Sequence, residues 1–576
     1  MSAHFKQDKP DTANRLDQMK QGTIGQPIPR VEGLAKVTGT APYAAEYPVE
    51  GCVEGVLATA TITRGEVVSV DRDSVMDMPG VIAVIEDPRM TTRAAQGTAN
   101  EAPQQSPRTV CYWGQPVALV VAETFEQARD AAKHLRVEYR EESDAPIDPQ
   151  VVDAEEQEDE TVRQGDLARA MSAAENAVDV TYTTKGHASA AMEPHAAIAQ
   201  WDGRQLTVHV SLQMLNYNIT ELADALDMEE DQVRIISRFV GGGFGSKLGL
   251  SEETVAAAIA AMELSRPVRV VMSRQQVFQC IMRRAETTQR LQLAADGEGR
   301  LAGFGHKALV SNLPGESFAE PVLQSSHFLY AAENRELMLE VARIHRMTAG
   351  SVRAPGEAVG MPTLEGAMDI LAERAGIDPV ELRLRNIPEK DPEEGLPFSS
   401  HKLAECLRQG AKAFGWDTGP RRPRHRREGE WWVGTGMASA ARVHNVGEAK
   451  ARVTIKPDGT ALVETDMTDI GTGTYTILAQ IAGEMLGLDP AEVLVDLGDT
   501  RHPRGSGSGG SWGAASTGSA VYVACQALRE EIANRVGIDE TALDLADGRV
   551  IGGQTLVDLL GGKELAREGH YEPGEI

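Results

Sequence analysis

The stretch FVGGGFGSKLGL, residues 239–250, raises the first question about this chain. Glycines surround Phe244, and Lys247 closes the run. The β-branched run QVRIISRFV precedes the loop, and SEETVAAAIAAMELS follows it, with Ser251 and first-turn acids typical of a helix start. A glycine turn between a strand and a helix exposes backbone N–H groups, which suit an anion.

Neither common nucleotide-binding fingerprint fits this loop. A P-loop requires G-x-x-x-x-G-K-[ST], but here Ser246 precedes Lys247 and Leu248 follows it. The dinucleotide fingerprint G-x-G-x-x-G, started at Gly241, has Ser246 in place of its third glycine. Taken alone, the loop is as consistent with a plain structural turn as with a binding site.

Two further stretches repeat the order of strand, glycine turn and helix. In ETDMTDIGTGTYTILAQIAGEML the turn is Gly471-Thr472-Gly473. In RGSGSGGSWGAASTGSAVYVACQALREE the glycines before the helix are Gly505, Gly507, Gly509, Gly510 and Gly513. Three such loops predict one extended ligand with several anionic or polar groups, and a large phosphorylated cofactor fits better than a mononucleotide. Three unrelated turns are the alternative.

The composition is that of an acidic globular protein. Of 576 residues, 41% are hydrophobic and 25% charged, and the formal net charge is −28. That charge argues against binding to nucleic acid or to anionic lipid. The five cysteines are scattered without a C-x-x-C pair, so no zinc ribbon or iron–sulfur site is expected in this chain. They are Cys52, Cys111, Cys280, Cys406 and Cys525.

The first twenty residues, MSAHFKQDKPDTANRLDQMK, show neither the apolar core of a signal peptide nor a twin arginine. No apolar run reaches the roughly 18 residues that a membrane span needs. The sequence by itself therefore predicts a cytoplasmic chain without a membrane span. Export with a signal-bearing partner subunit would place it in the periplasm instead.

Hydrophobic patterning predicts an α/β protein in several parts. A polar tail covers 1–28, and strands and helices alternate over 29–147. An acidic segment, 148–164, is predicted to be a linker to a second domain over 165–415. A basic connector, 416–430, then leads to a third domain over 431–576.

Eight motifs, in chain order, carry a family resemblance. They are GTAPYAAE, MEPHAA, SLQ, GGGFGSK, SVRAPGEAVG, DPVELRLRN, GTGTYTILAQ and GSGSGGSWGAAS. In this order the chain resembles the molybdopterin-binding large subunits of the xanthine dehydrogenase and aldehyde oxidase family, in particular the bacterial periplasmic aldehyde oxidoreductase branch. The resemblance implies an α/β hammerhead-like domain at 29–147, followed by a two-part molybdopterin-binding α/β region at 165–415 and 431–576.

The resemblance also implies the cofactor and its site. The cofactor is molybdopterin with molybdenum, as a cytosine dinucleotide. An amide such as that of Gln213 can orient an oxo group, which is a hydrogen-bond acceptor, and glycines let backbone N–H groups approach pterin and phosphate. The implied cofactor-binding residues are Gln213, Gly243, Phe244, Gly245, Arg353, Thr472, Gly473, Gly510, Ser511 and Gly513. Taken alone, each residue favours a simpler interpretation: Gln213 as a surface amide and Arg353 as an ordinary salt-bridge donor.

Three departures from the family pattern bear on the substrate. Purine-oxidising members carry a glutamate where this chain has Leu248, and a phenylalanine where it has Pro355. The carbon-monoxide branch carries a cysteine where it has Gly350. With Leu248 and Pro355 in the substrate pocket, the resemblance implies oxidation of aldehydes to carboxylic acids, with water as the oxygen source. Electrons would pass to an iron–sulfur subunit and an FAD subunit, since the chain has no cysteine cluster of its own.

The family's general base is a glutamate in a G-x-G-E-type motif near the C-terminus. The nearest stretch is EPGEI, with Gly574 and Glu575, and we do not assign that glutamate the role. Residues 537–576 are predicted to form helix and turns without the strands that would complete the sheet. The second part of the molybdopterin-binding region is therefore predicted to be truncated. The sequence identifies neither a catalytic residue nor a metal ligand.

Two alternative functions stay open from the sequence. One is an incomplete, catalytically inactive fragment or scaffold of the same family, because the general base is not identified. The other is a nicotinamide-dependent dehydrogenase, which the strand–glycine–helix order suggests and the failed fingerprints oppose.

Overall fold

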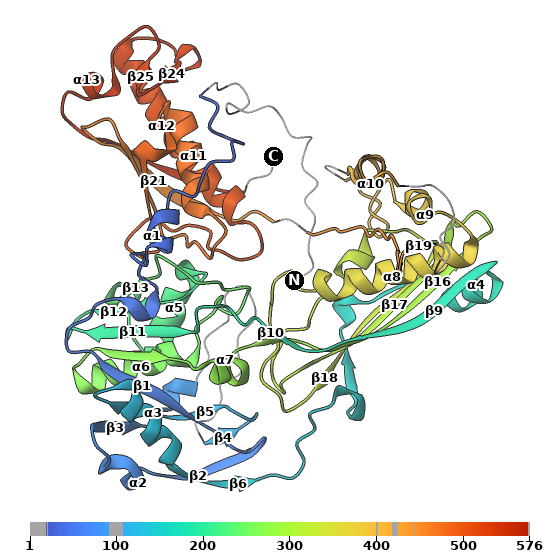
Figure 1. Ribbon diagram of the computed structural model, residues 1–576, viewed down its shortest axis with the longest axis horizontal. Helices are drawn as coiled ribbons and strands as arrows, with labels where there is room; N and C mark the ends of the chain where they lie inside the picture. The colour runs from blue at the N-terminus through green and yellow to red at the C-terminus, as the bar shows by residue number, and fades with distance from the viewer. Residues whose placement is uncertain are drawn as a thin grey trace.

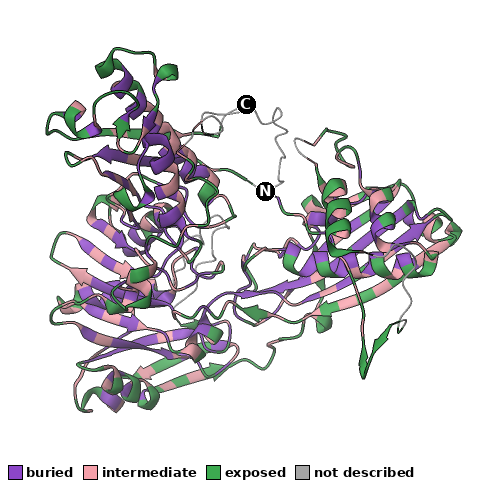
Figure 2. Ribbon diagram, turned by 45° about the horizontal axis from the view of Figure 1, so that its top comes forward, coloured by how far each residue is buried: buried purple, intermediate pink, exposed green. Residues whose placement is uncertain are grey.

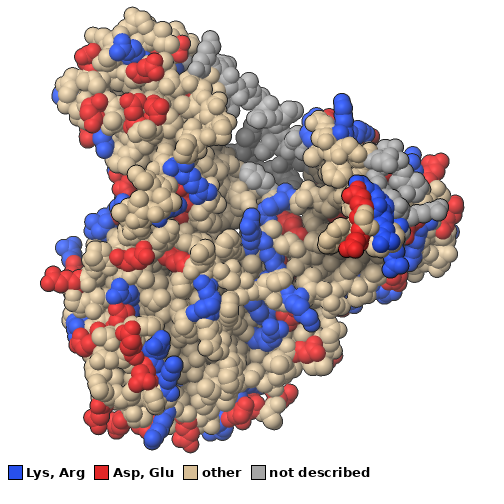
Figure 3. Space-filling model, viewed as in Figure 1, with Lys and Arg blue, Asp and Glu red and all other residues tan. Residues whose placement is uncertain are grey.

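The computed structural model describes residues 16, 19, 21–91, 108–398, 401–416, 424, 426–443 and 445–573. Figure 1 shows a column with a seven-stranded sheet below and a four-stranded sheet above, and an arm built on a six-stranded sheet. Within the described ranges, no helix is long and apolar enough to cross a membrane. On the face in Figure 3, acidic and basic side chains are interspersed.

The seven-stranded sheet has the order β13-β12-β11-β14-β1-β5-β3. Its strands are β1 (Val53–Thr59), β3 (Val81–Ile85), β5 (Pro116–Ala122), β11 (Ala196–Trp201), β12 (Leu206–Val210), β13 (Val233–Ile236) and β14 (Val268–Val271). β1 pairs in parallel with β14, so one sheet runs through both the predicted hammerhead-like domain and the domain after it. The nearly fully buried helix α6 (Glu252–Leu264) packs on β11 and β14. The domain boundaries stay a prediction.

The hammerhead-like region adds a smaller layer to this sheet. Strands β2 (Gly65–Asp71), β4 (Thr109–Val110) and β6 (Arg136–Glu141) form a three-stranded sheet in the order β4-β2-β6. Helix α3 (Phe125–His134) begins with a capping box at Thr124 and Gln127 and packs on β1 and β5.

The arm is a six-stranded sheet covered by α8 (Glu357–Ala375), which packs on β9 and β16. Its strands are β7 (Ala154–Glu156), β8 (Val162–Gln164), β9 (Asn176–Thr184), β16 (Thr287–Ala295), β17 (Leu301–Asn312) and β18 (Asn334–Arg343). The acidic segment that was predicted as a linker supplies β7 and β8, and both pair antiparallel with β18. This segment therefore adds to the edge of the arm's sheet as it connects the two regions.

The upper part of the column is a four-stranded sheet in the order β23-β22-β21-β26, with α11 (Thr474–Leu486) and α12 (Gly513–Val536) packed on it. Its strands are β21 (Ala449–Ile455), β22 (Ala461–Thr465), β23 (Val493–Leu497) and β26 (Leu565–Tyr571). Figure 2 shows the buried positions concentrated on the inner strands and on the helix faces that cover them.

The prediction that residues 537–576 form only helix and turns is wrong. β26 pairs antiparallel with β21 from Leu565 opposite Ile455 to Tyr571 opposite Ala449. The stretch LAREGHY contains no β-branched residue and one glycine, so its composition does not indicate a strand. Gly569 is required there because a Cβ at this position would lie 2.1 Å from the Ala520 carbonyl oxygen of α12.

Shorter elements complete the described chain. The remaining helices are α1 (Gly33–Val37), α2 (Asp73–Met76), α4 (Leu167–Ala173), α5 (Leu215–Leu226), α7 (Arg274–Cys280), α9 (Pro379–Asn386), α10 (Leu403–Phe414) and α13 (Leu556–Leu560). The remaining strands are β10 (His187–Ala188), β15 (Arg283–Arg284), β19 (Arg427–Glu428), β20 (Trp431–Trp432), β24 (Leu545–Ala546) and β25 (Arg549–Val550). Most of the predicted basic connector lies outside the described residues.

His327 joins the arm to the segment that follows α9. Its Nδ1 lies 2.9 Å from Glu393 and its Nε2 lies 3.7 Å from Glu160. Burial lowers the pKa of His327, but the two carboxylates outweigh burial and raise its pKa from 6.5 to about 9. The charged histidine therefore stabilises the folded arm at neutral pH.

We predict that H327Q lowers the stability of the protein in a pH-dependent way. Because the folded-state pKa is raised, the contribution is complete below pH 6.5 and is lost as the pH rises through about 9. Thermal unfolding should show the variant less stable at pH 6, by about 1–3 kcal/mol, and equal to the wild type near pH 10. The control is H134Q, an exposed histidine paired with Asp130 on α3. A pH-independent difference for H327Q would contradict the prediction.

Candidate cofactor site

Gln213 joins the first glycine loop to the third. Its side-chain Oε1 accepts from the backbone N–H of Gly245 at 3.0 Å and of Lys247 at 3.3 Å. Its Nε2 donates to the Ser508 carbonyl at 2.6 Å. Its own backbone carbonyl accepts from Ser508 N at 2.8 Å and from the Thr468 hydroxyl at 3.0 Å. The first and third loops, and Thr468 of the segment that leads into the second, therefore meet around one buried residue.

A buried ion pair holds the base of the first loop. Lys247 is fully buried, and its Nζ lies 3.0 Å from the carboxylate of Glu193, which also accepts from Gly241 N at 2.7 Å. Burial lowers the pKa of Lys247, and Glu193 opposes that shift. The nearby His195 is neutral at pH 7, because burial lowers its pKa to about 3. Its Nε2 lies 2.9 Å from the Ser246 carbonyl oxygen. MEPHAA therefore positions the glycine loop.

The loop crosses the arginine segment at very close range. Gly245 has φ +101°, and a Cβ there would lie 1.8 Å from the Ser351 carbonyl oxygen. Arg353 N donates to the Phe244 carbonyl at 2.7 Å. Phe244 itself has φ +56° and remains 38% exposed, so the crossing holds the ring partly outside the core. The Arg353 side chain is exposed and bonds to no residue in the described ranges.

Arg284 holds this arginine segment from behind. Its guanidinium donates to the backbone carbonyls of Val352, at 2.9 Å, Arg353 and Ala354. Its counter-ion is Glu320, at 2.6 Å, whose same oxygen accepts from Gly356 N. Burial raises the pKa of Glu320, and Arg284 opposes that shift. A forked cation that binds successive carbonyls fixes the loop which presents Arg353.

The third loop starts at Gly505, which is bonded to a buried acid of another segment, and it ends at the start of α12. Asp466 accepts from Gly505 N at 2.6 Å, and burial raises the pKa of Asp466 to about 7. Gly510 and Ser511 both have positive φ, and Gly513 starts α12 against Met467. Near its end, the Ser511 hydroxyl accepts from Arg442 Nε at 3.2 Å.

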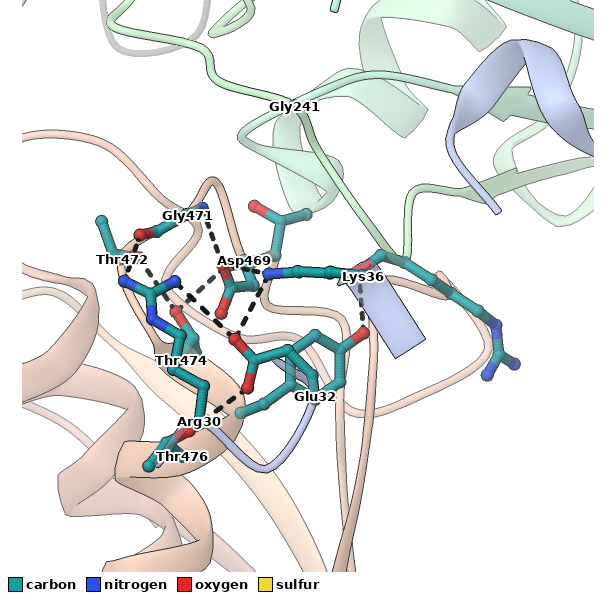
Figure 4. A network of polar contacts seen from close by, with 12 residues as sticks. Arg30, Glu32, Lys36, Gly241, Asp469, Gly471, Thr472, Thr474 and Thr476 are labelled. Carbon is teal, nitrogen blue, oxygen red and sulfur yellow. Dashed lines mark hydrogen bonds and ion pairs between the residues drawn. The ribbon is translucent and has the colours of Figure 1, made fainter. Parts of the chain in front are cut away.

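The second loop lies at the start of α11 (Figure 4). Gly471 and Gly473 have φ +96° and +87°, and a Cβ at Gly471 would meet nothing within 4 Å. Thr472 between them is exposed. Asp469 is fully buried, and its Oδ1 accepts from Gly471 N at 2.7 Å, whereas its Oδ2 lacks a hydrogen-bond partner among the described residues. The loop therefore has free space beside Gly471, and the buried Asp469 beneath it has one oxygen whose hydrogen-bonding capacity is unused.

The two predicted pocket residues differ in their surroundings. Leu248 is buried, and its side chain lies 2.8 Å from the position that a Cβ on Gly509 would take. Pro355 is half-buried, two residues after the exposed Arg353. A larger residue at Gly350 would require the Met282 side chain to move, because a Cβ there would lie 2.4 Å from the Met282 sulfur. Gly574 and Glu575 lie outside the described residues.

This arrangement fits a large ligand that combines a ring system with anionic groups. The open face of Gly471, the orphaned Asp469 oxygen, the free guanidinium of Arg353 and the exposed ring of Phe244 are all unused by the fold. They offer backbone donors, an acceptor, a cation and an apolar surface, which are the groups that a pterin with phosphates requires. Whether each predicted residue contacts the cofactor stays a prediction.

Comparison with known proteins identifies the family. Residues 38–143 match the hammerhead domain of aldehyde oxidase and xanthine dehydrogenase, and residues 149–387 and 409–575 match molybdopterin cofactor-binding domains. The aldehyde oxidoreductase molybdenum-binding subunit PaoC of Escherichia coli is 41% identical over 99% of this chain and 79% of its own length. This chain belongs to the molybdopterin-binding subunits of the aldehyde oxidase and xanthine dehydrogenase family.

More distant members and solved structures agree. A xanthine dehydrogenase molybdenum-binding subunit of Escherichia coli is 28% identical over 81% of this molybdopterin-binding chain and 66% of its own length. Quinoline 2-oxidoreductase from Pseudomonas putida superposes with a TM-score of 0.82 at 21% identity, over 97% of this chain and 80% of that one. The aldehyde oxidoreductase of Desulfovibrio gigas superposes with a TM-score of 0.76 at 22% identity, over 94% of this chain and 62% of that one. The α/β fold predicted from the sequence is thus confirmed.

Sequence reasoning identified the loops of this molybdopterin-binding chain but missed the residues that hold them. The prediction missed Glu193, Arg284 and Glu320. Each is an ordinary charged residue whose partners lie 36 to 68 positions away in these contacts. The sequence offered a signal only for Glu193, which lies inside the motif MEPHAA, whereas Arg284 and Glu320 lie in none of the quoted motifs. The amide of Gln213, predicted to face an oxo group, is bonded to loop backbone here, so that role stays a prediction.

We predict that G245A disrupts the crossing of the first loop and the arginine segment. The new Cβ would overlap the Ser351 carbonyl, and φ +101° is unfavourable for alanine. Thermal unfolding should show a loss of several degrees, on the order of 5 °C. The control G203A has a similar φ of +92° but no atom within 4 Å, so it carries the backbone strain alone. Equal losses for the two variants would contradict the prediction.

Proposed function

We propose that this chain is the molybdenum-binding subunit of an enzyme that oxidises aldehydes to carboxylic acids, with water as the oxygen source. The convergence on Gln213 of the first and third glycine loops and of the segment that leads into the second carries the proposal, because it builds one site for an extended cofactor from distant segments. The similarity to an aldehyde oxidoreductase subunit at 41% identity supports the reaction class. The cytosine dinucleotide form of the cofactor is part of the proposal.

The cofactor, when bound, supplies a Lewis-acidic metal and a two-electron acceptor. The chain's own residues bind this cofactor and orient it. Backbone N–H groups of the loops at Gly243–Gly245, Thr472–Gly473 and Gly510–Gly513 hold pterin and phosphate, and Arg353 offers an uncommitted cation. Leu248 gives the predicted pocket an apolar wall, which suits an uncharged aldehyde. We assign no general base within this chain.

Electron transfer requires partners in this proposal. All five cysteines are free thiols, two of them buried, and they are scattered along the sequence. We propose that an iron–sulfur subunit and an FAD subunit receive the electrons, and several relatives are named as subunits of larger enzymes. The free cysteines favour this arrangement over clusters within the chain.

Metal analysis tests the proposed function. The complex purified from cells that make molybdopterin should contain about one molybdenum per chain of this type, and the isolated chain should contain no stoichiometric iron. The released nucleotide should be cytidine monophosphate. Stoichiometric iron or zinc in the isolated chain, or a complex without molybdenum, would overturn the proposal.

The substrate prediction follows from Leu248 and Pro355. Aromatic and aliphatic aldehydes should be oxidised, and xanthine should be a poor substrate by a factor on the order of 10⁴ in kcat/KM, because a purine would bury polar groups without partners. Steady-state rates with benzaldehyde, a short aliphatic aldehyde and xanthine, with an artificial acceptor, measure this. Comparable rates on xanthine and benzaldehyde would show that these two positions do not set the specificity.

A further inference from the structure

The segment before α1 does not stay with the hammerhead-like region that follows it. Residues 22–31 lie along α11 of the upper sheet instead, as Figures 1 and 4 show. Backbone N–H groups of Gly22 and Thr23 donate to the Glu484 carboxylate at 3.1 and 2.7 Å, and Val31 N donates to the Thr476 hydroxyl at 3.1 Å. We call residues 22–36 the N-terminal strap.

The strap brings Arg30 to the second glycine loop. Its Nη2 donates to the Gly471 carbonyl at 2.8 Å, and its guanidinium lies 3.9 Å from where a Cβ on Gly473 would be. Among the described residues its counter-ion is Glu32, 3.7 Å from Nη1, and 47% of the Arg30 side chain is exposed. Most of the five donors of this guanidinium are therefore available to a ligand.

Glu32 and Lys36 hold this arrangement in place. Glu32 is bonded by Lys36 at 3.2 Å and by the Thr476 hydroxyl at 3.2 Å. Lys36 also lies 3.8 Å from Asp469, so its charge faces both acids of the group. The two carboxylates are thus matched by Lys36 and the α11 hydroxyl, and Arg30 is the cation with unused capacity.

Two features of the loop itself point to a ligand at this place. Helix α11 begins at Gly473 without a side-chain cap and without an acid of its own in the first turn, so its first backbone N–H groups stay uncapped although Glu32 of the strap accepts from the Thr476 hydroxyl. The buried Asp469 has one oxygen without a donor among the residues described, which suits an N–H or O–H group of a ligand rather than its phosphate. Asp469 also accepts from Val240 N at 3.3 Å through its carbonyl, so this loop adjoins the first glycine loop.

We propose that Arg30 binds a phosphate of the molybdopterin cofactor and holds it at the N-terminus of α11. This inference rests on the proposed function, since it takes the cofactor of that site as its ligand. The guanidinium, anchored on Gly471, and the first-turn N–H groups form a donor set for phosphate oxygens. The N-terminal strap is then a wall of the cofactor site supplied by a segment more than 400 residues away in sequence.

The test compares cofactor retention in R30Q, R30K and R64Q. Arg64 is the matched control because it too is partly exposed, donates to a backbone carbonyl at 2.8 Å and pairs with a glutamate, but in the hammerhead-like region. Each full-length variant is purified in its complex, dialysed, and assayed for molybdenum and released nucleotide per chain. Loss of a charge-assisted hydrogen bond to phosphate should speed cofactor loss about tenfold or more in R30Q.

We expect R30K to lie between R30Q and the wild type, and R64Q to match the wild type. Rising salt should accelerate cofactor loss in the wild type more than in R30Q, because the ion pair is screened. The cofactor-free chains of the wild type and R30Q should unfold at nearly the same temperature, because an exposed arginine contributes little to folding.

Three outcomes would overturn the inference. Equal retention in R30Q and the wild type, with molybdenum present in both, would remove Arg30 and leave the proposed function standing. A cofactor-free R30Q that unfolds many degrees lower would assign Arg30 to docking of the N-terminal strap alone. A wild-type complex without molybdenum would overturn the proposed function and this inference together.

Discussion

The burial of Gln213 between the first and third glycine loops holds the centre of the site together. All of its polar groups are used: the backbone N–H donates to Lys247, the backbone carbonyl accepts from Ser508 and Thr468, and the amide reaches both loops. A buried amide must satisfy both its donor and its acceptor, so an apolar replacement would leave loop N–H and C=O groups unpaired. The residue therefore fixes the distance between the loops.

Strain in the loops persists because charged groups surround them. Phe244, Ala354 and Ser511 have φ between +55° and +61°, which non-glycine residues adopt rarely. Such conformations need surroundings that determine them completely. The Glu193–Lys247 and Arg284–Glu320 pairs supply this around Phe244 and Ala354, since in each a charge binds loop backbone as well as its partner. Buried ion pairs contribute little net stability, so we infer that their role here is to position the loop backbone.

The sequence predicted those parts of the molecule whose signals are local. A strand, a glycine turn and a helix are adjacent in sequence, so three loops and an extended ligand followed from them, and motif order added the family. The contacts of Arg30, Glu193 and Arg284 join distant segments, and no local pattern marks them. β26 was missed for a related reason: its pairing with β21 and its packing under α12, rather than its composition, make it a strand.

The separation of these segments has a consequence for cofactor binding. Gln213 and Ser508 are 295 residues apart, and the upper sheet docks on β13 through the ion pair of Arg234 with Asp499 at 2.5 Å. The site exists only when that docking is complete. A ligand that binds only the docked state stabilises it by mass action, and equally binds more weakly whenever docking is loosened. Retention of the cofactor is therefore a property of the interface between the two sheets as much as of the residues that touch it.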